Sequence, residues 1–116
     1  MESQGPPVSL VIEVDRNAEV SIVRCHGMIV SGLADYLDTV AGKLIPQSQL
    51  VILDLADVQW IDSKGVATLA GLFQLGATSG CHLKLINLHK SLSERPGLQS
   101  LQHRFPHFAD HRTLTA

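Results

Sequence analysis

The stretch that decides the fold is Val51-Ile-Leu-Asp-Leu-Ala-Asp-Val-Gln-Trp-Ile-Asp-Ser-Lys-Gly-Val66. Residues 50–55 form an almost continuous apolar run, which is typical of a strand in a sheet covered on both faces. A more polar segment over 56–61 is predicted to be a loop. A broad apolar stripe then predicts a helix over 64–79. The stretch therefore predicts a loop that delivers Ser63 to the start of a helix.

The same reading on either side of this stretch predicts the other elements. Upstream, apolar runs predict an antiparallel hairpin that Gly27 closes, and a helix that starts at Ser31 or Gly32 and stops at Pro46. The Ser31 side chain is a candidate cap for that helix. The predicted elements are strands 8–14 and 18–26 around a turn at 15–17, a helix before Pro46, strand 50–55, helix 64–79, strand 82–88, a helix over 91–101 and a docked tail over 104–116.

This order, β-β-α-β-α-β-α, predicts a single α/β domain with a four- to five-stranded mixed sheet and three to four helices. The strands joined by helix 64–79 should be parallel. Gly71 and Gly76 weaken this helix, so each is expected where the backbone approaches another element. Residues 1–7 end in Gly-Pro-Pro and predict a flexible lead, which leaves 8–116 for the domain.

Composition excludes several classes of protein. Of 116 residues, 45% are hydrophobic and 17% are charged, which argues against intrinsic disorder. The net charge of −2, with Lys and Arg scattered singly, argues against a nucleic-acid partner. No leader or apolar run suited to secretion or a membrane span is present, so we expect a cytoplasmic protein. Cys25 and Cys81 are expected to be free thiols, with a disulfide left open.

Ser63 stands at a chemically distinctive position. The first amides of a helix lack internal partners, and that end of the helix carries partial positive charge. A phosphate placed there meets N–H donors and a favourable dipole. These residues alone favour a simpler interpretation, because Asp62 and Ser63 are common capping residues and Gly65 eases the turn.

The wider pattern resembles the STAS family, named for sulphate transporters and anti-sigma factor antagonists. The resemblance runs from about Val8 to Phe108, and rests on the hairpin with Gly27, the V-I-L-D-L strand and, six residues later, the D-S-x-G turn. It implies that Ser63 is the acceptor of a phosphate. It also implies a partner-binding surface around that serine, for which the candidate residues are Gly27, Trp60, Asp62, Ser63, Lys64 and Gly65.

The resemblance also implies partners. Antagonists of this family bind an anti-sigma factor that is also a GHKL-type serine kinase, and phosphorylation by that kinase releases them. A PP2C-type phosphatase resets the serine. The resemblance implies no cofactor, and the chain contains no nucleophile elbow, Walker loop or GxGxxG motif, so an enzyme is not expected.

Some residues depart from the antagonist pattern. Lys64 replaces a second hydroxyl residue, and Gly27-Met28-Ile29-Val30 lacks the acidic residues that antagonists often carry there. Three alternatives therefore stay open: a stressosome-like scaffold, a subunit of a lipid-transport ATPase, and a domain that binds a small ligand or nucleotide.

Other conspicuous residues favour ordinary roles. Trp60 is more typical of a core or loop anchor, although an exposed Trp60 would be a partner hot spot. Asp54 and Asp57 fit turn formation or surface charge better than acid–base catalysis. The spacing of His103, His107 and His111 suggests a metal site, but Pro106 interrupts the helix that would align them, and no metal is expected.

Overall fold

The computed structural model describes residues 8–104 as one α/β domain with a four-stranded mixed sheet in the order β1-β2-β3-β4. β1 pairs with β2 antiparallel, whereas β2–β3 and β3–β4 are parallel, as predicted for the hairpin and for the strands around helix 64–79. The proposed lead (1–7) and almost all of the tail (104–116) lie outside the described residues. The elements are β1 (Leu10–Asn17), β2 (Val20–Ile29), α1 (Ala34–Leu44), η1 (Ile45–Gln47), β3 (Leu50–Ile61), α2 (Ser63–Ser79), β4 (His82–Ile86), α3 (Lys90–Ser93) and α4 (Pro96–Arg104).

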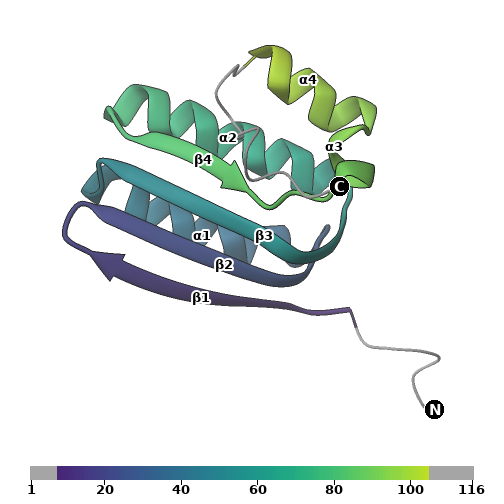
Figure 1. Ribbon diagram of the computed structural model, residues 1–116, viewed down its shortest axis with the longest axis horizontal. Coiled ribbons are helices and arrows are strands. Elements are labelled where there is room, and N and C mark those ends of the chain that lie inside the picture. Colours follow the sequence, from purple (N-terminus) through teal and green to yellow (C-terminus); the bar gives the residue numbers. More distant parts are fainter. Residues whose placement is uncertain (1–7, 105–116) are drawn as a thin grey trace.

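The core lies between the sheet and the helices α1 and α2, which cover one face of it (Figure 1). Side chains alternate along each strand, so Val23 and Cys25 of β2 and Leu53 and Leu55 of β3 point into this core and are fully buried. Burying each large aliphatic side chain contributes about 1.5–3 kcal/mol. Both cysteines are free and buried, and burial raises the pKa of the Cys25 thiol to about 12.

The loop predicted over 56–61 is wrong, because β3 continues to Ile61. The pairing of β2 with β3 shifts register between Arg24 and His26, and again between Gly27 and Met28. These irregularities interrupt the alternation of buried and exposed residues by which a strand is recognised in a sequence. β3 therefore reaches directly to Asp62.

The predicted ends of the hairpin are also wrong. Residues 15–17 belong to β1, and the turn lies at Ala18, which adopts a positive φ of 56°. Gly27 does not close the hairpin but lies inside β2 with φ +118°, where a Cβ atom would lie 2.1 Å from the carbonyl oxygen of Ser9. Gly27 thus lets β2 continue past the start of β1 to Ile29.

The helices differ from the predictions at their ends. Ser31 does not cap α1, whose N-cap is Leu33 without a side-chain hydrogen bond. The helix predicted over 91–101 is two helices, because Pro96 begins α4, a position where its missing N–H costs nothing. In α2, Gly76 does approach another element, since its Cβ would lie 2.9 Å from the Cys81 carbonyl oxygen, but Gly71 has no neighbour within 4 Å.

Candidate functional site

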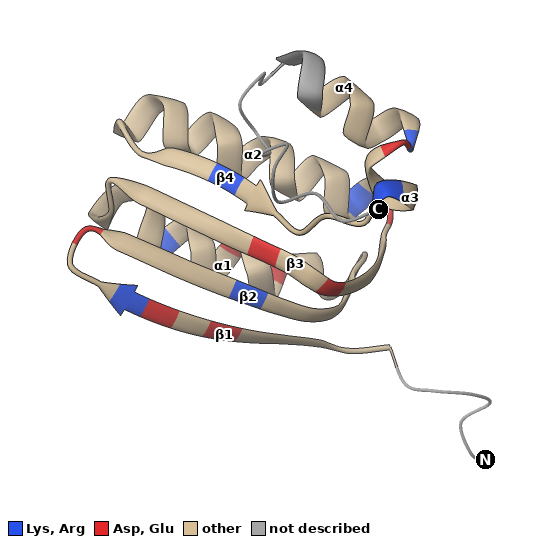
Figure 2. Cartoon of the chain, in the orientation of Figure 1, with Lys and Arg blue, Asp and Glu red and all other residues tan. Residues whose placement is uncertain are grey.

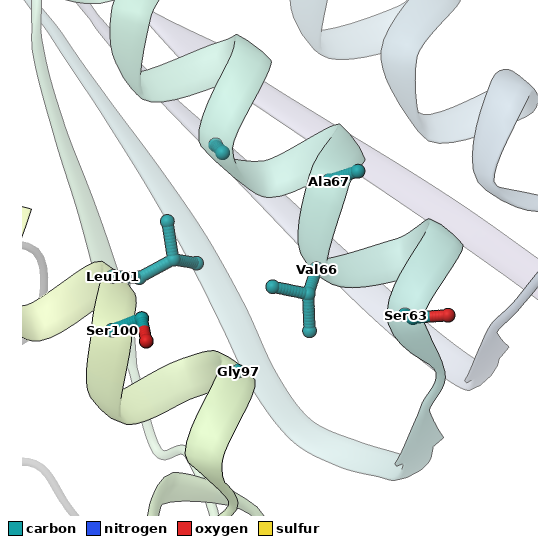
Figure 3. Close-up of a pocket in the computed structure, with 7 residues that line it drawn as sticks. Ser63, Val66, Ala67, Gly97, Ser100 and Leu101 are labelled. Carbon is teal, nitrogen blue, oxygen red and sulfur yellow. The ribbon is translucent and has the colours of Figure 1, made fainter.

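Ser63 is the first residue of α2, directly after the cap residue that follows β3, and its side chain is exposed. Figure 3 shows its hydroxyl oxygen pointing away from α4. Within the described residues, this hydroxyl has no hydrogen-bond partner. A phosphoryl group could therefore be attached without displacing any buried group.

Asp62 holds the start of α2 in place. Its Oδ1 accepts a hydrogen bond of 2.8 Å from the Gly65 amide, and its Oδ2 accepts one of 2.9 Å from the Ser31 amide. These bonds, the one from Ser31 first and the one from Gly65 second, lower the pKa of Asp62. The carboxylate therefore stays charged and joins the segment before α1 to the first turn of α2.

Gly65 is required by close packing rather than by its backbone angle. It is buried, and a Cβ atom there would lie 2.1 Å from the Ile29 carbonyl oxygen and 2.8 Å from Cγ2 of Ile61. The first turn of α2 thus packs on the ends of β2 and β3. Lys64, between Gly65 and Ser63, is exposed and places one cation beside the serine.

The sequence favoured a core or loop anchor at Trp60, but Trp60 does not lie in the core, because 46% of its surface is exposed near the end of β3. The guanidinium of Arg95 lies 4.1 Å from the centre of the Trp60 ring, a cation–π contact. Nη1 of Arg95 also donates to the Ile61 carbonyl oxygen. Trp60, three positions before Ser63 in the chain, and the half-buried Arg95 therefore form an aromatic and cationic surface near the end of β3.

A shallow groove of about 370 Å³ lies between α2 and α4, with Ser63 at one end of it. In Figure 3, Val66 of α2 points toward Gly97, Ser100 and Leu101 of α4 across this groove. A Cβ atom at Gly97 would lie 3.3 Å from a methyl carbon of Val66, so the two helices approach closely there. The groove therefore adds a mostly apolar surface next to Ser63.

Of the six candidate residues, Trp60, Asp62, Ser63, Lys64 and Gly65 follow one another closely at the junction of β3 and α2, whereas Gly27 serves the path of β2. Sequence reasoning missed Ser31, which contributes its backbone amide, and Arg95. No short sequence motif marks either residue, because each is more than 30 positions along the chain from the group that it contacts.

The two aspartates of β3 make separate contacts. Asp54 accepts hydrogen bonds from the Ala56 amide and from Nδ2 of Asn87, at 3.0 and 3.1 Å. Asp57 instead pairs with a ring nitrogen of His26 at 2.8 Å.

Among residues 8–101, no three His, Cys, Asp or Glu side chains are grouped so as to hold a metal ion. None of the described helices combines the length and the apolar character needed to cross a bilayer.

Comparison with known proteins identifies the family. A model of the STAS domain matches residues 11–113. The chain belongs to the STAS domain family. In this chain Asp62 alone separates β3 from α2, and Ser63 is the first residue of α2.

Solved structures show which proteins this STAS domain is similar to. An anti-sigma factor antagonist from Mycobacterium paratuberculosis has a TM-score of 0.70 and 25% identity, with 89% of this chain and 88% of that chain covered. SpoIIAA is similar in its unphosphorylated form (TM-score 0.64, 13% identity, 86% and 87% covered). The phosphorylated form of the Bacillus SpoIIAA gives 0.63 and 11%, with 86% and 89% covered.

A third similar protein, Mglu, is much longer. Its TM-score is 0.58 at 23% identity, with 63% of this chain covered, and this chain spans only 18% of it. No curated protein sequence matches this chain. The likenesses to SpoIIAA and Mglu, at 11–23% identity, concern the fold alone, whereas the antagonist from Mycobacterium paratuberculosis is 25% identical over most of both chains.

Proposed function

We propose that this STAS domain is an anti-sigma factor antagonist, a non-enzymatic protein-binding domain of the cytoplasm that is switched by reversible phosphorylation of Ser63. The observation that carries the proposal is the exposed Ser63 hydroxyl at the first position of α2. The similarity to a described antagonist over nearly the full length of both chains supports it. The proposed partners are an anti-sigma factor that is a GHKL-type serine kinase and a PP2C-type phosphatase.

A phosphate at Ser63 should leave the fold intact. It adds about −1.5 to −2 charges at pH 7. The N-terminus of α2 favours that charge by about 0.3–1 kcal/mol. Asp62 disfavours the phosphate, because its negative carboxylate already accepts the hydrogen bond of the Gly65 amide at the same end of the helix. These small opposing effects leave the domain near its original stability.

The same charge should weaken docking of a partner. The surface beside Ser63 includes exposed Trp60 and the groove between α2 and α4, both suited to apolar contact. A dianion buried against such an interface loses hydration without a matched partner. A penalty of only about 2.8 kcal/mol lowers the affinity about a hundredfold. Phosphorylation would thus act on binding rather than on folding.

Phosphate transfer tests the site. With the cognate kinase and ATP, intact-mass spectrometry should show one added phosphate on the wild-type chain and none on the Ser63→Ala variant. Ser100→Ala is the matched control, because Ser100 is an exposed serine on the other side of the same groove and its loss should change nothing. Uptake of a phosphate by the Ser63→Ala variant would show that the site is assigned wrongly.

Calorimetry with the same kinase tests the switch. The phosphorylated chain should bind about a hundredfold more weakly than the unmodified chain, while its circular dichroism spectrum stays the same. Equal affinities would rule out the switch. Isolation with a stoichiometric ATPase or scaffold would instead favour a structural subunit, and heat evolved with ATP or GTP alone would favour a ligand-binding domain.

A further inference from the structure

The sheet has a second face, opposite the one that packs on α1 and α2, and we call it the open face. Strand pairing places its residues in straight rows across all four strands. The central row contains Asp15 of β1, Ile22 of β2, Ile52 of β3 and Lys84 of β4, each opposite the next. Their immediate neighbours along β2 and β3 (Ser21, Val23, Val51, Leu53) are buried on the other face.

The middle of the open face is aliphatic. Ile22 and Ile52 are only partly buried, and neither packs against the core cluster. The row beside them has Val20 and Leu50 at its centre, which are also partly buried. A hollow of about 560 Å³, lined in part by Val20, Leu50 and Lys84, borders this aliphatic patch.

The two edges of the open face carry opposite charges. Figure 2 shows acidic segments and one basic segment along β1, and a basic segment on β4. The basic residue of β1, Arg16, is opposite the buried Ser21 and so belongs to the other face. Asp15 belongs to the acidic edge and Lys84 to the basic edge, at the two ends of the central row. Within residues 8–101, neither has an ion-pair partner. The face is thus apolar at its centre, with unpaired charges of opposite sign at its sides.

We propose that the open face binds a second copy of this chain in a two-fold, face-to-face dimer. If the two-fold axis runs parallel to the strands, β1 of one copy lies over β4 of its partner. Each Asp15 then faces a Lys84 of the other copy, and Ile22 of each copy meets Ile52 of the other. In one neighbouring row Arg24 and Asp54 are adjacent at the centre and exchange places across the axis, while Glu13 and Ile86 lie at its two ends.

The charges select this arrangement over the other face-to-face one. An axis perpendicular to the strands would place β1 over β1, so that Glu13 and Asp15 of the two copies would repel. Sheets that pack face to face lie about 10 Å apart and cross at about 30°, a displacement that long lysine and arginine side chains can span. The face measures about 400 Å² in projection, so the dimer is weak and depends on concentration.

A charge exchange tests the dimer on the full chain. Sedimentation equilibrium from about 10 µM to about 1 mM should show a reversible monomer–dimer equilibrium. Asp15→Lys or Lys84→Asp alone puts like charges together twice in each dimer and should weaken association at least about tenfold. The double variant Asp15→Lys/Lys84→Asp should recover to within about threefold of the wild-type chain.

Recovery would identify a contact between copies. Within one copy, Asp15 and Lys84 are three strand spacings apart, about 14 Å, which exceeds the screening length of about 8 Å at physiological salt. Lys43→Asp on the exposed surface of α1 is the matched control and should leave association unchanged. A chain that remains monomeric at every concentration overturns the proposal, as does a double variant that stays as weak as the single ones. Either result would leave the open face to a different partner.

Discussion

Gly65 and Gly71 lie on the same helix in opposite surroundings, which makes them a matched pair for an experiment. A methyl group on Gly65 would collide with the Ile29 carbonyl oxygen, whereas one on Gly71 would meet nothing within 4 Å. Gly65→Ala should therefore lower the free energy of unfolding by about 2–4 kcal/mol. Gly71→Ala should raise it by about 0.5–1 kcal/mol, because alanine favours a helix. Urea denaturation measures both, and similar effects of the two substitutions would contradict the packing described for Gly65.

Asp62 predicts how stability responds to acid. Its pKa is lowered in the folded chain, so its contribution is present above the unfolded pKa of about 3.9 and is lost as the pH falls through the folded value. Asp62→Asn should therefore be less stable than the wild-type chain at pH 7, and the gap should narrow below about pH 4. Denaturant titrations across this range measure the gap, with Asp38→Asn on the surface of α1 as a control. A gap that stays constant to the lowest pH would show that charge on Asp62 is unimportant.

The edge strand β1 is tied to the rest of the sheet by His26 of β2. One ring nitrogen lies 2.9 Å from a carboxylate oxygen of Glu13 on β1, and the other lies 2.8 Å from one of Asp57 on β3. A neutral imidazole has one N–H and can donate to only one carboxylate, so this geometry requires the protonated ring. The hydrogen bonds to Asp57 and then to Glu13 raise the pKa of His26.

This arrangement predicts a loss of stability in alkali. Because the folded pKa is raised, the contribution of His26 is fully present below the unfolded pKa of about 6.5 and is lost as the pH rises through the folded value. The Tm difference between the wild-type chain and His26→Gln should be largest near pH 6 and should shrink toward pH 9. In the His26→Gln background, Glu13→Gln should have little further effect. Independent effects of these two substitutions would contradict the ion pair.

Elements that carry long, regular patterns could be predicted from the sequence. The apolar run before residue 56 and the stripe of α2 marked a parallel strand–helix–strand unit, and the structure confirms it. The second half of β3 was missed because register shifts against β2 interrupt its alternation. One helix was predicted over 91–101, whereas in the structure Pro96, a residue suited to a helix start, begins α4.

The site could be predicted only where its residues are neighbours in sequence. Asp62, Ser63 and Gly65 share one short motif, and their positions follow from the capping chemistry of a helix start. The bond from the Ser31 amide to Asp62 crosses 31 positions, and the bond from Arg95 to Ile61 crosses 34. Such contacts depend on how the elements pack, and one sequence offers no pattern for them.

At the scale of the whole molecule, the sheet separates two surfaces. Ser63 lies at the start of α2, on the side of the helices, whereas the aliphatic rows of the open face lie on the other side (Figure 1). A dimer through the open face would therefore leave both copies of Ser63 accessible to a kinase. Phosphorylation and self-association should then be independent, since they use opposite sides of the sheet.

The segment formed by α3 and α4 is joined to this core partly through Arg95. Its guanidinium covers Trp60 and donates to the Ile61 carbonyl oxygen, two residues before Ser63. A cation–π contact contributes about 0.5–2 kcal/mol, and a hydrogen bond from a charged group contributes about 1.5–3 kcal/mol. Arg95→Ala should therefore speed amide hydrogen exchange in residues 98–101 by about tenfold or more, through local opening of α4.

Exchange in β3 should stay unchanged in the same Arg95→Ala sample, because Leu53 and Leu55 belong to the buried core rather than to this contact. Lys90→Ala provides the control, since Lys90 is an exposed cation of α3. Mass spectrometry of exchanged peptides separates the two regions. Uniformly faster exchange would mean that Arg95 stabilises the whole domain, and unchanged exchange in α4 would mean that Leu98 and Leu101, both buried, hold the helix without it. A selective effect on α4 would show that this contact controls one wall of the groove beside Ser63, and thereby the shape of the surface proposed to bind the kinase.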